Sequence, residues 1–199
     1  KVKVTCTKSN EGFATAGGVQ YVACAGNFKD AGLEYTGALK VLQMIFSYEY
    51  LWIQIRVKGG AYGCMCSFSD QGDSMFVTYR DPNLSESYKV YDEAADYVAD
   101  FDADDRDMKK YIIGTIGSMD MPMEAVDMGA RSFHAYFLGK TEADLQKVRD
   151  QVLSCTQEDI RALAPIVKAV VEAGNRCCIG NEEKIDQNKE YFDEVKHVL

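Results

Sequence analysis

The chain has 199 residues, 47% of them hydrophobic, which is enough for one large folded domain. Its 31 Asp and Glu outnumber its 22 Lys and Arg, giving a net charge of -9 with the basic residues scattered. Such a chain would repel a phosphate backbone, which excludes nucleic acid as a partner. The richest apolar window, residues 38–55, is interrupted by Lys40, Gln43 and Glu49, so no membrane span is predicted.

The first half of the chain predicts strands around one long helix. Residues 19–25 (VQYVACA) are β-branched, aromatic or small and lie between glycines, which is typical of a central strand. Residues 35–56 carry apolar side chains on nearly every helical face and predict a helix buried on most sides. Residues 62–68 and 74–79 predict a hairpin around a polar turn. Residues 84–101 return to a helical period, so the sheet acquires helical cover.

The second half predicts mostly helix, over residues 104–119, 122–138, 141–153 and 156–173. The last two segments each begin with a threonine cap followed by first-turn acids, which is a specific helix-start signal. A further strand is predicted at residues 175–180, and a final helix at residues 182–197.

The order of these elements predicts the fold class. Strands precede and follow a block of helices without strict alternation, which favours an α+β two-layer sandwich. We expect a mixed or mostly antiparallel sheet covered on one face by helices. No linker, internal repeat or low-complexity segment divides the chain, so residues 1–199 are predicted to form a single domain. The opening has neither Met nor a signal peptide, and we expect a piece of a longer protein.

The seven cysteines indicate a reducing environment, and we expect the cytoplasm, because their number is odd and several lie in apolar, β-prone segments. Cys64 with Cys66, and Cys177 with Cys178, are candidate zinc ligands. Alternation along a strand instead places Cys64 and Cys66 on one face as small hydrophobic residues. No C-x-x-C motif and no paired histidine accompanies them, so the pattern favours buried thiols.

Other candidate sites also have plainer structural explanations. His134 lies in an aromatic helical segment, where a packed core histidine is more common than a ligand or proton donor. The acidic residues 100–107 lack the central glycine and terminal Glu of a calcium loop, and they suit the first turn of the next helix. A thiol-dependent hydrolase stays as an alternative, although no cysteine has the basic setting that favours a thiolate.

A glycine turn joins the long helix to the hairpin, and its three small residues are Gly59, Gly60 and Ala61. They would let another backbone approach while the side chains of Arg56 and Tyr62 protrude. This arrangement suits hydrogen bonding to a peptide carbonyl or an oxyanion. Composition alone favours the plainer interpretation, in which the glycines end a helix, Arg56 lies at the negative end of the helix dipole and Tyr62 is an ordinary strand residue.

The segment 56–63 (RVKGGAYG) resembles the Arg-x-x-Gly-Gly-Ala-Tyr-Gly signature in the C-terminal half of the presequence-protease branch of insulinase-type (pitrilysin) zinc metallopeptidases. Residues 64–98, which include a Tyr-Arg-Asp-Pro-Asn turn, are similar to that branch, as are residues 112–123 (IIGTIGSMDMPM). The resemblance covers nearly the whole chain. The Arg and Tyr of the signature carry most of its specificity.

The resemblance implies a place in a larger enzyme. In that family four homologous α+β domains close like a clamshell, and the first binds zinc through an inverted H-x-x-E-H motif and a later Glu. Nothing in this chain matches that motif. The resemblance therefore implies the fourth, C-terminal domain, with zinc bound by the N-terminal domains of the same polypeptide.

The resemblance also implies roles for residues of the glycine turn. Arg56 and Tyr62 would reach across the chamber and donate hydrogen bonds to the developing oxyanion or to an adjacent carbonyl of a short, unstructured peptide. Residues 59–61 would contact the same peptide. This chain alone is then expected to bind peptide without cleaving it. The alternative is a non-catalytic structural or interaction module of the same fold.

Overall fold

The computed structural model describes residues 2 and 7–198. Within them, one mixed sheet forms with the strand order β3-β4-β2-β5-β1-β6. Strand β1 runs parallel to β5 and β6, whereas the pairs β2–β4, β2–β5 and β3–β4 are antiparallel. The strands are β1 (Glu11–Thr15), β2 (Tyr21–Asn27), β3 (Gly63–Phe68), β4 (Asp73–Tyr79), β5 (Asn175–Asn181) and β6 (Glu194–His197).

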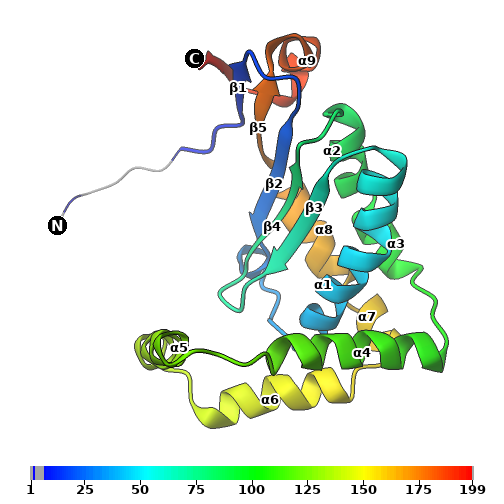
Figure 1. Cartoon of the computed structure of the whole chain (residues 1–199), viewed down its shortest axis with the longest axis vertical. Coiled ribbons are helices and arrows are strands. Elements are labelled where there is room, and N and C mark those ends of the chain that lie inside the picture. Colours follow the sequence, from blue (N-terminus) through cyan, green and yellow to red (C-terminus); the bar gives the residue numbers. More distant parts are fainter. Residues whose placement is uncertain (1, 3–6, 199) are drawn as a thin grey trace.

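Helices cover one face of this sheet, and the other face is open (Figure 1). The covering helices are α1 (Ala38–Tyr48), α2 (Ser85–Asp92), α3 (Ala94–Ala99), α8 (Ala164–Glu172) and α9 (Glu182–Gln187). Beyond one end of the sheet lie α4 (Asp105–Met119), α5 (Ala125–Phe137), α6 (Glu142–Leu153) and α7 (Gln157–Arg161). The predicted α+β sandwich with one covered sheet face is confirmed. None of the described helices is long and apolar enough to cross a membrane.

The core lies between the sheet and its helices, as the alternation along β4 shows. Phe76 is fully buried on the covered face, while Met75 and Tyr79 are exposed on the open face. On the helix side, Phe46 of α1 is also fully buried, and its ring lies 5.7 Å from that of Phe76 and 6.1 Å from that of Tyr97. Aromatic packing therefore joins α1, α3 and the sheet.

Three predicted helices are interrupted. The helix predicted over residues 35–56 breaks at Glu49, whose φ of -113° and ψ of -84° are not helical, and a π-helix, η2 (Trp52–Lys58), follows. The Glu49 carboxylate accepts a hydrogen bond from the Tyr111 hydroxyl at 2.9 Å, so a contact with α4 helps to hold the break. Residues 84–101 likewise form two helices, α2 and α3, and residues 156–173 form α7 and α8.

The prediction of one final helix over residues 182–197 is wrong. Helix α9 ends at Gln187, the short 3-10 helix η3 (Lys189–Tyr191) follows, and residues 194–197 form β6 beside β1. Strand β1 itself was not predicted. The edge of the sheet formed by β1 supplies the pairing that turns the end of the chain into a strand, and this pairing leaves no local signal in the sequence.

Helix α5, which follows α4 and precedes α6 in the chain, stands apart from the body of the domain, past the ends of those two helices (Figure 1). None of its residues is buried, and Phe133, Tyr136 and Phe137 expose 60%, 80% and 69% of their surface. The prediction that His134 is a packed core residue is therefore wrong, because this histidine is exposed on α5. Its helix has an apolar side but no covering element among the described residues.

Candidate functional site

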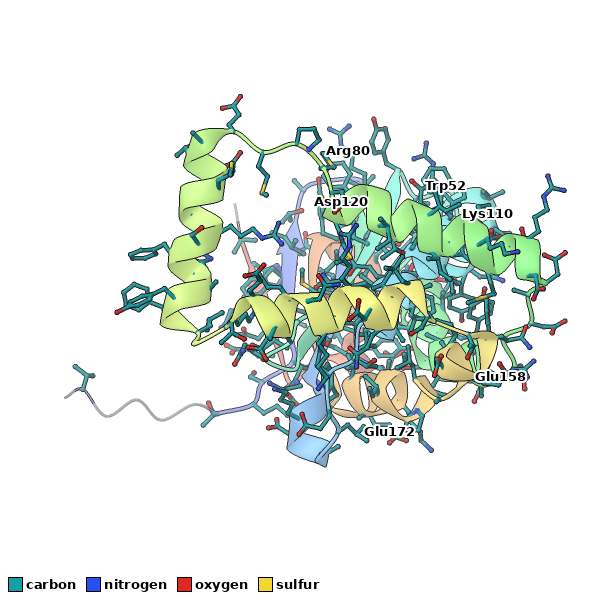
Figure 2. The ribbon with its side chains drawn as sticks, turned by 90° about the horizontal axis from the view of Figure 1, so that it is seen from below. Trp52, Arg80, Lys110, Asp120, Glu158 and Glu172 are labelled. Atoms are coloured by element: carbon teal, nitrogen blue, oxygen red, sulfur yellow. The ribbon has the colours of Figure 1, made fainter. Side chains whose placement is uncertain are left out.

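The π-helix η2 places Arg56 at the surface, close to an aromatic ring. The residues Trp52 and Arg56 are four positions apart, and the guanidinium carbon of Arg56 lies 4.2 Å from the centre of the Trp52 ring. This contact is a cation–π interaction on the solvent side of the helix. Figure 2 shows Trp52 and Arg80 at one edge of the molecule and Glu172 at the opposite edge.

The glycine turn brings Tyr62 back beside Arg56. One guanidinium nitrogen of Arg56 donates to the backbone carbonyl of Tyr62 at 2.9 Å, and the guanidinium carbon lies 5.7 Å from the Tyr62 ring centre. The turn needs Gly60, whose φ of +80° lies in the left-handed region that favours glycine. The two predicted side chains, six positions apart in the sequence, are therefore brought together by this turn.

Both predicted side chains are accessible. Arg56 is exposed, and Tyr62 exposes 65% of its surface. The Tyr62 hydroxyl donates to no other described residue, and its ring meets the edge of Tyr79 at 5.8 Å between centroids. Tyr79 in turn contacts Tyr21 at 5.5 Å, so an aromatic row leads from the turn onto the open sheet face.

The backbone N–H groups of the glycine turn are already engaged in hydrogen bonds and are not available to a ligand. The N–H groups of residues 59–61 donate to carbonyl oxygens of residues 54–56 at 3.0 or 3.1 Å, and the N–H of Tyr62 donates to the Arg80 carbonyl at 3.2 Å. Each of these donors is already satisfied within the domain. Side chains, rather than backbone amides, are the donors that this turn can present.

The three small residues of the turn differ in their surroundings. Gly60 is exposed and Gly59 is half-buried, whereas the side chain of Ala61 is only 4% exposed and packs in the core. Burial explains the small size of Ala61 without any ligand. Peptide contact at all three positions stays a prediction.

A second turn, the Asp-Pro-Asn segment after the hairpin, contacts the glycine turn directly. The side-chain amide of Asn83 donates to the Gly59 carbonyl at 2.6 Å, and Asp81 accepts the backbone N–H of Asn83 at 2.9 Å. The Asp-Pro-Asn sequence was the available signal, because Asp commonly accepts a backbone N–H two residues on. That signal predicts a turn but does not reveal which carbonyl the Asn reaches.

A cavity of about 530 Å³ lies beside Trp52, between α1, α4 and β3. Its lining includes Tyr48, Cys64 and Thr115. The indole of Trp52 is 39% exposed and is shared between this cavity and the contact with Arg56. Trp52 therefore links this cavity to Arg56, although neither Arg56 nor Tyr62 lines the cavity itself.

The cysteines are free thiols, with Cys6 outside the described residues. Burial raises the pKa of Cys64 to about 11, although the nearby Arg56 guanidinium lowers it in part. Burial likewise raises the pKa of Cys24 to about 11 and that of Cys178 to about 12. A raised pKa disfavours the thiolate, so these surroundings do not suit a cysteine nucleophile.

The described residues contain no group of three or more His, Cys, Asp or Glu side chains arranged to hold a metal ion. The acidic residues 100–107 serve the start of α4 instead, where the Asp104 carboxylate accepts the backbone N–H groups of Arg106 and Asp107 at 2.9 Å. Asp104 is thus the N-cap, one position before the predicted first turn, which contains Asp105 and Asp107. The chain as described does not fit a zinc ion.

Comparison with known proteins identifies the family of this chain. A family model described as the PreP C-terminal domain matches residues 10–181. The chain belongs to this family. The matched residues of this PreP C-terminal domain include the glycine turn and the Asp81–Asn83 turn. They also include every strand of the sheet except β6.

Relatives of the PreP C-terminal domain are much longer proteins. Protein HypA of Clostridium perfringens is 43% identical over 192 residues, which cover 96% of this chain and 20% of that protein. Presequence protease 1, chloroplastic/mitochondrial, of Arabidopsis thaliana is 34% identical over 194 residues, covering 96% of this chain and 18% of that protein. The chain thus spans about a fifth of the length of these relatives.

Solved structures show the same fold. A peptidase M16 inactive domain from Pseudomonas fluorescens superposes with a TM-score of 0.61 at 15% identity, covering 86% of this chain and 43% of that one. At this identity the likeness concerns the fold of the PreP C-terminal domain. The predicted relationship to insulinase-type peptidases is confirmed by the family match and the presequence protease relative.

Proposed function

We propose that this domain supplies substrate-binding side chains to a zinc-dependent endopeptidase that degrades short, unstructured peptides. The observation that carries the proposal is the joint exposure of Arg56 and Tyr62 on a turn whose backbone is internally hydrogen-bonded. The zinc and the chemistry it supplies belong to other domains of the parent polypeptide. The proposed partners of this chain are those domains and the peptide, and the proposed location is the cytoplasm, which suits its free thiols.

The chain's own contribution is hydrogen bonding to the substrate. The Tyr62 hydroxyl and the outward N–H groups of Arg56 can donate to a carbonyl oxygen as negative charge develops on it. The contact with Trp52 and the bond to the Tyr62 carbonyl restrict the guanidinium before any peptide arrives. Such preorganisation lowers the cost of ordering the donors in the transition state. Donors without the metal-binding domains bind but do not cleave.

The test uses the parent protein with Arg56→Ala or Tyr62→Phe and a fluorogenic peptide. We expect kcat to fall about a hundredfold or more in each variant, because each loses one donor to the developing charge. The zinc content should be unchanged, since no described residue of this domain groups into a metal site.

Matched controls are available on the same domain. Tyr136 is 80% exposed on α5, and Arg106 is exposed on α4, so Tyr136→Phe and Arg106→Ala remove similar groups far from the glycine turn. These variants should keep full turnover. Full turnover in both Arg56→Ala and Tyr62→Phe would reject the proposal and favour a non-catalytic module.

A further inference from the structure

The end of η2 is tied to the rest of the domain through one side chain. The Asn83 amide donates to the carbonyl oxygen of Gly59 at 2.6 Å. Gly59 is the residue at which the chain leaves η2, and Gly60 follows with its positive φ. This hydrogen bond therefore acts at the point where the direction of the chain toward Tyr62 is set.

Asn83 is itself held by a buried carboxylate. Asp81 is 0% exposed, and its two oxygens accept hydrogen bonds from the Asn83 backbone N–H at 2.9 Å and from the Ser87 hydroxyl at 2.6 Å. The backbone of Asp81 also exchanges two hydrogen bonds with Gln20, at 2.7 and 2.9 Å. Asp81 thus bonds to the residue just before β2, to α2 and to Asn83. These bonds hold the backbone of Asn83 in place relative to the rest of the domain.

The neighbouring residue Arg80 completes the connection. Its carbonyl accepts the N–H of Tyr62 at 3.2 Å, and its φ of 50° is the positive value of a non-glycine residue. The two ends of the glycine turn, Gly59 and Tyr62, therefore both bond to residues of one short segment, 80–83. If either hydrogen bond were removed, the turn would stay attached to this segment at one end only and could rotate about that end.

We infer that Asn83 is a positioning residue that fixes Arg56 and Tyr62 in the geometry that binds substrate. This inference rests on the proposed function of those two side chains. Without the Asn83 amide, the Gly59 carbonyl loses this donor and the turn gains freedom about Gly59 and Gly60. Arg56 then leaves the Trp52 ring for part of the time, and Tyr62 moves with it.

A spectroscopic test uses the 199-residue chain alone. Trp52 is its single tryptophan, so the intrinsic fluorescence reports the contact with Arg56 directly. In Asn83→Asp, which removes the amide donor at nearly constant size, we expect emission at longer wavelength and stronger acrylamide quenching. The matched control is Asn188→Asp, because the Asn188 amide also donates to a backbone carbonyl, that of Lys184 at 2.8 Å, in a distant turn. This control should leave the emission unchanged.

A kinetic test uses the parent protein. Asn83→Asp should lower kcat about tenfold to a hundredfold with little change in KM or zinc content, because small misplacements of catalytic groups act on the transition state. Combining Asn83→Asp with Tyr62→Phe should then lower kcat by clearly less than the product of the two single losses, because the part of the Asn83 effect that acts through the Tyr62 hydroxyl is already gone. A general weakening of the fold would instead multiply the two losses. If Asn83→Asp does not fold, Asn83→Ala removes the same donor without adding a charge.

The outcomes separate this inference from the proposed function. Unchanged Trp52 emission together with unchanged turnover in a folded Asn83 variant would overturn the inference, whatever Tyr62→Phe does. Multiplicative losses in the double variant would overturn it as well. A shifted emission, with full turnover in both Arg56→Ala and Tyr62→Phe, would support the role of Asn83 in fixing the turn and reject the proposed function alone.

Discussion

The thiol of Cys24 gives the domain a defined sensitivity to alkaline pH. Burial raises its pKa from 9.0 to about 11. Below pH 9 this thiol is protonated in both folded and unfolded chains, so its contribution to stability is complete. Between pH 9 and 11 the folded chain binds more protons than the unfolded chain, and the free energy of unfolding falls as pH rises.

The prediction compares the wild type with Cys24→Ala by urea unfolding at several pH values. The difference in unfolding free energy between the two should shrink between pH 9 and 11, by at most about 1.4 kcal/mol per pH unit. Below pH 9 it should be constant. A difference that stays constant up to pH 11 would show that Cys24 does not titrate as its burial requires.

At this scale the sequence predicted the two exposed side chains of the candidate site but not Asn83, to which we assign the positioning role. Arg56 and Tyr62 lie in a recognisable signature, and the glycines between them predict a turn. Asn83 contacts that turn only because β3 and β4 fold back on each other, which places residue 83 beside residue 59. The identity of a hydrogen-bond acceptor across a hairpin cannot be deduced from local residue types.

Among the elements, α8 and β2 make a close contact that depends on Gly26. A Cβ atom added there would lie 2.4 Å from the Val170 carbonyl oxygen, which is backbone and cannot rotate away. We expect Gly26→Ala to lower the free energy of unfolding by about 2–3 kcal/mol, because helix and strand must separate. Urea unfolding monitored by circular dichroism measures this change.

The control for Gly26→Ala is Gly117→Ala in α4. A Cβ atom at Gly117 meets nothing within 4 Å, and its backbone is helical. This substitution should raise stability by about 0.5–1 kcal/mol, since alanine favours helix more than glycine does. Equal losses in both variants would mean that the contact at Gly26 is not what limits the substitution.

Helical periodicity predicted where most helices lie but not where they break or what they touch. The break at Glu49 is held in part by Tyr111, 62 positions away, so no local pattern announces it. Helix α5 was predicted correctly as a helix, yet its apolar side faces no described element. Periodicity shows that a helix has an apolar side, and only the tertiary structure shows whether that side is covered.

For the molecule as a whole, β6 completes a sheet whose other strands lie within the family match. Phe192, just before β6, would touch a Cβ atom placed on Gly12 of β1 at 3.0 Å, and the Tyr191 ring lies 4.9 Å from that of Tyr88. A chain ending at residue 188 loses these contacts and leaves β1 as an edge strand. We expect it to be less stable by roughly 2 kcal/mol or more.

Hydrogen exchange tests this expectation at the strand concerned. Amides of β1 should exchange faster in the shortened chain, whereas those of β4, on the other side of the sheet, should keep most of their relative protection. Equal protection of β1 in both chains would show that β6 contributes little to the sheet.

The strand order has a consequence for how the protein is made. Within this domain, strand β1 leaves the ribosome before the other strands, but both of its neighbours, β5 and β6, are formed by residues beyond 174. During translation β1 therefore waits, with its backbone groups unpaired, until almost the whole domain has emerged. Long-range parallel pairing of this kind is slow and leaves nascent strands open to aggregation. We expect synthesis of this domain to depend on chaperones more than its stability would suggest.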